Sequence, residues 1–252
     1  MSQQIPVQKT SFLVPKIAAM GVVVCYGIAL IGTEWLRYAP NDFSGSSCSM
    51  KDVYEFNTNC IKALWHSRAS SNHLYLLFRL FDVFSILLML PVFIGFQKLI
   101  KDKDSSSFMI GCVKIACLFN VIHNLFNTLA RTSTTYRSLF TSDEHIAELE
   151  IAYMITSRLL SWMGSVDELM MCIAFLYIAA LGHKNKFFAK SFNILSLLIG
   201  ILAFLAFIFG MLYFLADFFF IPEMICSLIY LLLMWGWMFY AFYIFQSVDN
   251  QI

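Results

Sequence analysis

Three charged residues interrupt an apolar segment that is long enough to cross a membrane. Arg158, Asp167 and Glu168 all lie within residues 150–181. Such charges are costly in a bilayer and usually face a protein interior or a water-filled cavity. On a helix that turns about 100° per residue, Arg158 and Glu168 share one stripe, whereas Asp167 points away from it. The segment therefore predicts a helix with two polar sides, and the side with Glu168 is the candidate functional face.

A polar pocket between three helices is one interpretation of these charges. Arg79 and Asp82 are three residues apart on one face of a second apolar segment, and His123 shares a face with asparagines on a third. Opposite charges at similar depth on neighbouring helices are expected to pair. The alternative interpretation is a set of buried ion pairs and amide hydrogen bonds that hold the three helices together without a ligand. The predicted pocket residues are Arg79, Asp82, His123, Asn124, Asn127, Arg158 and Glu168.

Lys114 and Asp167 form a second predicted grouping. Their estimated depths differ by only about 4 Å at the rise of a helix, so a structural ion pair between them is feasible. In an alternative interpretation, the Lys114 side chain extends so that its ammonium group reaches the cytoplasmic interface.

Acid/base chemistry is a further possibility, because His123 lies well inside an apolar segment and its charge changes near neutral pH. A single buried histidine is more often a satisfied hydrogen-bonding residue. The sequence has neither His-x-x-x-His nor Cys-x-x-Cys, and it lacks glycine-rich phosphate loops and the Gly-x-Ser-x-Gly elbow. We therefore expect no metal and no cofactor.

The elements that carry these residues are predicted to be membrane helices. Of the 252 residues, 60% are hydrophobic and 13% charged, whereas soluble domains average about 25% charged. The apolar residues occur in blocks of the length that spans a bilayer. The predicted fold is all-α: a single polytopic membrane domain whose bundle has a polar core of the second to fourth helices and a wall of the last two. The six predicted spans are residues 12–32, 74–98, 108–130, 150–181, 191–216 and 222–246.

A polar loop, residues 33–73, follows the first span and contains Cys48 and Cys60. Lysines are densest in the short segments on the side of the termini, which predicts that both termini are cytoplasmic. The loop then lies in a compartment where a disulfide can persist, so we expect Cys48 to pair with Cys60, with two unpaired thiols as the alternative. Residues 54–65 have the pattern of a short amphipathic helix on the membrane surface.

The layout of residues 12–246 resembles bacterial multi-pass membrane proteins that are grouped only as a domain of unknown function. The shared features are a first helix, a long outer loop, a second helix with the run Leu76-Leu-Phe-Arg-Leu-Phe-Asp82, a charged fourth helix and a closing hydrophobic hairpin. The resemblance implies a fold and no activity.

Three functional hypotheses follow. The leading one is a non-enzymatic protein that binds a membrane-protein partner or a small amphipathic ligand in the outward-facing pocket. The second is an enzyme in which His123 and Glu168 or Asp82 perform acid/base work on a lipid-like substrate. The third is a proton-coupled transporter that uses the same carboxylates. The bilayer is the expected environment, and a net charge of +1 gives no basic surface for nucleic acid.

Overall fold

The computed structural model describes residues 12–38, 48, 53, 55–100, 103–185, 188–213 and 220–250, and within these ranges it is helical, with no strand. Six helices are long and apolar enough to cross a membrane, which confirms the prediction of an all-α, polytopic membrane protein. A short helix, α3 (Thr58–Ser70), and a 3-10 turn, Asp143–His145, complete the described elements. The six long helices are α1 (Leu13–Tyr38), α4 (Asn72–Leu99), α5 (Lys103–Ser138), α6 (Ile146–Asn185), α7 (Lys190–Tyr213) and α8 (Phe220–Asp249).

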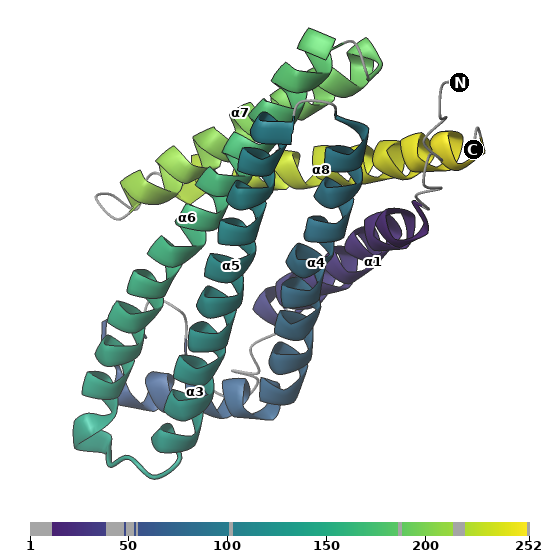
Figure 1. The fold of residues 1–252 in the computed structure, drawn as a ribbon. Helices are drawn as coiled ribbons and strands as arrows, with labels where there is room; N and C mark the ends of the chain where they lie inside the picture. The colour runs from purple at the N-terminus through teal and green to yellow at the C-terminus, as the bar shows by residue number, and fades with distance from the viewer. Residues whose placement is uncertain are drawn as a thin grey trace, which may run out of the picture.

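The long helices form a closed ring. Each one packs against its sequence neighbour among the six, and α8 returns to α1. Figure 1 shows the start of α1 and the end of α8 on the same side of the molecule, and α3 near the opposite end of α4, α5 and α6. We call the end with the start of α1 and the end of α8 the terminal end, and the end with α3 the distal end. Since the ring is closed, side chains from all six helices can meet on its inside.

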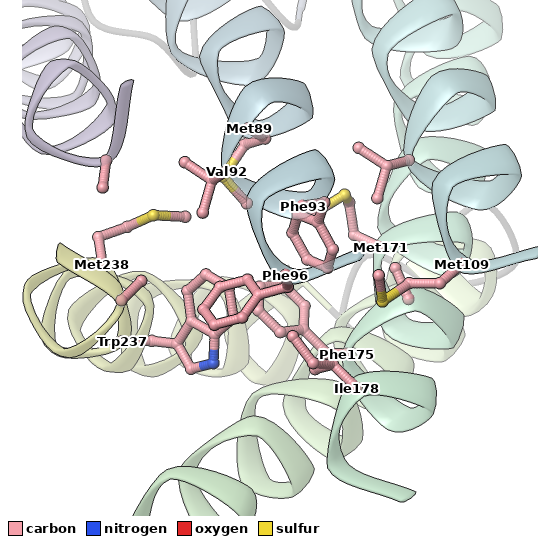
Figure 2. Packing of buried hydrophobic residues seen from close by; sticks show 14 of the residues in the cluster. Met89, Val92, Phe93, Phe96, Met109, Met171, Phe175, Ile178, Trp237 and Met238 are labelled. Carbon is pink, nitrogen blue, oxygen red and sulfur yellow. The ribbon is translucent and has the colours of Figure 1, made fainter. Parts of the chain in front are cut away.

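The terminal end is closed by aromatic packing. The Phe96 ring lies 5.2 Å from the Trp237 ring and 4.8 Å from the Phe245 ring, measured between centroids. Trp237 is fully buried and donates its indole N–H to the Ser196 hydroxyl over 2.7 Å. Figure 2 shows Phe93, Phe96, Phe175 and Trp237 packed together between the helices. In a membrane such packing and hydrogen bonding hold helices together, because lipid tails are as apolar as the side chains.

A clasp joins the two ends of the chain at this same end. Asp249 accepts the backbone N–H of Phe12 over 3.0 Å and pairs with the Lys16 ammonium at 2.5 Å. Lys16 also donates to the Gln246 side chain over 3.2 Å. The start of α1 is thereby fixed to the end of α8.

The distal end extends beyond a bilayer core. Helices α5 and α6 contain 36 and 40 residues, whereas about 20 residues cross the hydrocarbon. Both helices are longer than the predicted spans, and α3 packs against their overhanging part and occupies residues 58–70 of the predicted loop 33–73. Cys60 in α3 is disulfide-bonded to Cys48, with the two Cα atoms 5.5 Å apart.

Candidate functional site

A cavity of about 390 Å³ lies inside the ring. All six long helices contribute residues to its lining. They include α7 and α8, which we expected to form a wall of the bundle outside its polar core. The polar side chains come mainly from α4, α5 and α6, and most of the apolar ones from α1, α4 and α8. The cavity is therefore amphipathic in cross-section. Its lining residues are Val22, Tyr26, Asp82, Ser85, Ile86, Met89, Asn120, His123, Asn124, Gly164, Ser165, Asp167, Glu168, Met171, Gly210, Tyr230 and Met234.

The cavity has a defined depth in the bundle. Counted from the terminal end at the rise of a helix, Asp82, His123 and Glu168 each lie about 25–30 Å along their helices. The methionines Met89 and Met171 belong both to the cavity wall and to the aromatic core. Figure 2 shows these two methionines beside Phe93. The apolar core thus forms the floor of the cavity on the terminal side.

Asp82 forms an ion pair with Arg79 of the same helix. The Arg79 guanidinium lies 3.5 Å from the Asp82 carboxylate, one helical turn away, and donates over 3.1 Å to the amide oxygen of Asn124. Its Nε donates to the Tyr75 hydroxyl over 3.1 Å. Arg79 itself is not part of the cavity lining. It lies behind Asp82 and Asn124 and compensates one of the cavity's carboxylates.

Asp167 ends a chain of side-chain hydrogen bonds that crosses three helices. Asn124 donates over 3.0 Å to the side-chain oxygen of Asn120, and Asn120 donates over 2.8 Å to Asp167. With the bond from Arg79 to Asn124, the chain runs from a cation on α4 to a carboxylate on α6. Amide side chains can do this because each has both a donor and an acceptor. The hydrogen bonds that we considered as a purely structural alternative are therefore present, and they surround the cavity.

The predicted Lys114–Asp167 pair is absent from the ion pairs of the described residues. Lys114 is exposed on the outside of α5, whereas Asp167 lines the cavity and accepts from Asn120. Lys114 and Asn120 are six residues apart, about 240° around the helix, so the two side chains leave α5 in different directions. Asp167 and Glu168 consequently line the same cavity, although the sequence placed them on separate polar sides.

His123 is fixed by α6. Its Nδ1 lies 2.7 Å from the carbonyl oxygen of Leu160, which requires the hydrogen on Nδ1 and leaves Nε2 as an acceptor in the neutral ring. Gly164, one turn further along α6, lies against the ring: a Cβ there would be 3.1 Å from the imidazole. No ion pair between His123 and a carboxylate occurs among the residues that the structure describes.

Three predicted pocket residues, Arg79, Asn127 and Arg158, lie outside the cavity lining. Arg158 is exposed on α6, and Asn127 is buried in α5 outside the cavity lining. Tyr26 and Tyr230 are among the lining residues that were not predicted. Each is a tyrosine in the middle of an apolar span, away from the interfacial positions where tyrosine is common. Their position in the middle of an apolar span is the sequence feature that could have identified them as lining residues.

These observations define the class of protein: a polytopic α-helical membrane protein with a carboxylate-rich cavity enclosed by its six long helices. Within the described ranges, no group of three or more His, Cys, Asp and Glu side chains has the geometry to hold a metal ion. The chain matches no protein-family model, no curated protein and no solved structure. The geometry of the cavity thus carries the functional argument.

Proposed function

We propose that this protein binds a small basic amphiphile, an organic amine with an apolar part, in the cavity inside the helical ring. The observation that supports this most directly is the lining of the 390 Å³ cavity, which contains three carboxylates. A volume of this size suits a small organic molecule. The bound amine would lie among Asp82, Asp167 and Glu168, and its apolar part would face the methionines.

The charge of the lining favours a cation. His123 is the single basic side chain in the cavity wall, against the three carboxylates. Arg79 compensates Asp82 from behind the wall. In a site of low dielectric constant, excess negative charge attracts a cation more strongly than the same charge would in water. Tyr26 and Tyr230 add aromatic rings, and the face of such a ring attracts an ammonium group.

The direction of access is part of the proposal. The aromatic core and the Lys16–Asp249 clasp close the terminal side of the cavity. A ligand therefore enters from the distal side or from the bilayer. Since the lysine density predicts cytoplasmic termini, we place the distal end, with its disulfide, on the non-cytoplasmic side of the membrane.

The other functional hypotheses have less geometric support. An acid/base enzyme needs a base within hydrogen-bond reach of the proton it moves, whereas the His123 ring is hydrogen-bonded to the backbone carbonyl of Leu160. A transporter site is typically built around discontinuous helices, whereas α4, α5 and α6 are continuous through the cavity.

Thermal unfolding of the purified protein in neutral-lipid nanodiscs tests the proposal, with n-octylamine, n-octanoate and n-octanol as probes of matched apolar length. We expect octylamine to raise the unfolding temperature by about 5 °C at saturation, and the other two to leave it unchanged. Glu168→Gln should abolish most of this shift, because the substitution removes one carboxylate of the cavity. The matched control is Glu148→Gln, which changes an exposed carboxylate of the same helix. Equal shifts for octylamine and octanol, or an unchanged shift in Glu168→Gln, would refute the proposal.

A further inference from the structure

Three arginines converge at the distal end, outside the cavity. We call Arg68 of α3, Arg79 of α4 and Arg131 of α5 the distal arginine cluster. The Arg131 guanidinium lies 3.9 Å from the centre of the Tyr75 ring, and Arg79 lies 5.2 Å from the same ring. Arg68 lies 4.5 Å from the Trp65 ring. Stacking covers a face of each guanidinium and leaves its N–H edges to donate in the plane.

The positive charges of this cluster are not all paired with acidic side chains. Arg68 lies 3.8 Å from the Glu150 carboxylate, which also accepts the indole N–H of Trp65, and Arg79 pairs with Asp82. Arg131 forms no ion pair among the described residues. The charges that act on it include those of Arg68 and Arg79, which repel it. Because arginine stays protonated in proteins, the cluster has a positive charge that no described acidic residue compensates.

Hydrogen-bond donors in the cluster are also unmatched. Arg131 Nε and Arg68 Nη1 are buried and have no hydrogen-bond partner. The hydroxyl of Thr135, one turn from Arg131 and on the same face of α5, is likewise buried without one, and Thr135 is only 2% exposed. A buried donor without an acceptor costs free energy, so a native protein usually provides one. An anionic acceptor at this place would match both the excess positive charge and the unused donors.

The depth of Arg131 indicates where that anion comes from. Arg131 is 28 residues from Lys103, the start of α5 at the terminal end, which is about 42 Å along the helix. A bilayer including its headgroups is about 40–45 Å thick. Arg131 therefore lies at the level of the headgroups of the distal leaflet, where lipid phosphates are found.

We propose that the distal arginine cluster binds a phosphate-bearing anion, with Arg131 as its main contact. The planar N–H fork of arginine matches two phosphate oxygens, and such charge-assisted bonds are about twice as strong as neutral ones. The phosphate belongs either to an anionic lipid of the distal leaflet or to a soluble phosphate compound. Arg131 and Arg68 do not line the amine-binding cavity, and Arg79 connects the two sites through its ion pair with Asp82.

Native mass spectrometry of the detergent-purified protein distinguishes these sources. One arm adds phosphatidylglycerol or, for comparison, phosphatidylcholine, and counts retained lipids. The second arm adds inorganic phosphate to protein in phosphatidylcholine nanodiscs and measures thermal stabilisation. We expect preferential retention of phosphatidylglycerol in the first arm if the anion is a lipid, and saturable stabilisation in the second if it is soluble. Either response should fall about tenfold in Arg131→Gln, because one charge-assisted contact is lost.

Two further variants keep the result interpretable. Arg137→Gln removes an exposed arginine of the same helix and should leave anion binding unchanged. Arg131→Lys keeps the charge but removes the planar fork, so its affinity should be intermediate, and it serves as the second test if Arg131→Gln is poorly folded. Equal anion binding by wild type, Arg131→Gln and Arg131→Lys would overturn the proposal, and so would the absence of a response in both arms.

Discussion

Asn120 is the residue on which the polar chain through the bundle depends. It donates to Asp167 and accepts from Asn124, so its loss leaves a carboxylate oxygen and an amide hydrogen without partners. We predict that Asn120→Ala lowers the free energy of unfolding by about 1–3 kcal/mol, the usual cost of an unpaired buried polar group. Unfolding in a titration of a denaturing detergent measures this change.

The control for Asn120 is Lys114→Met on the same helix. Lys114 is exposed, so the substitution should change stability by no more than about 0.5 kcal/mol. The two variants also decide between two partners for Asp167. If Asp167 depended on Lys114 instead of Asn120, Lys114→Met would be the destabilising variant, and the predicted order would be reversed.

At the residue scale the sequence identified part of the site. Asp82, His123, Asn124 and Glu168 were predicted, because a polar group in an apolar span is costly and needs a reason. Tyr26 was not, because tyrosine is tolerated in apolar segments. The exposure of Arg158 was also unpredictable. Its direction depends on the rotation of α6 about its axis, which the neighbouring helices fix.

Among the elements, the contact of α4 with α1 and α8 depends on a small residue. A Cβ at Gly95 would lie 2.8 Å from both the Phe245 ring and the Pro15 side chain, closer than side chains normally approach. We predict that Gly95→Ala destabilises the protein by about 1–3 kcal/mol through overpacking. Gly111→Ala in α5 is the matched control, because nothing lies within 4 Å of its added methyl group. That variant should be neutral or slightly stabilising, since alanine favours the helix. Thermal unfolding of both variants checks the difference, and equal effects would contradict the packing argument.

The elements themselves were the most predictable part of the molecule. Their positions follow from apolar length and from the requirement that backbone groups in lipid bond within a helix. The overhang of α5 and α6 was missed, because their distal residues are polar and read as a loop. Packing against α3 extends these helices, and that contact depends on residues distant in sequence.

At the scale of the whole molecule, the closed ring was beyond the sequence. Alternating apolar helices have the same pattern whether they form a row or a ring, and only the contact of α8 with α1 closes it. Closure is what brings Tyr230 to face the carboxylates of α4 and α6, and it turns separate polar stripes into one cavity. The proposed function therefore depends on the contact between α1 and α8, to which the Lys16–Asp249 pair contributes.

The sidedness of the ring is the remaining prediction for the whole molecule. If the termini are cytoplasmic, the turn between α5 and α6 lies outside the cell or in a topologically equivalent compartment. Phe140, 89% exposed in that turn, and Lys184, exposed near the end of α6, then lie on opposite sides of the membrane. Phe140→Cys should react with a membrane-impermeant maleimide in sealed right-side-out membranes, whereas Lys184→Cys should react only after permeabilisation. The parent protein is the control, because the described cysteines outside the Cys48–Cys60 disulfide lie within membrane helices and should stay unlabelled. Labelling of Lys184→Cys alone in sealed membranes would invert the orientation, and the cavity would then receive its ligand from the cytoplasm or the inner leaflet.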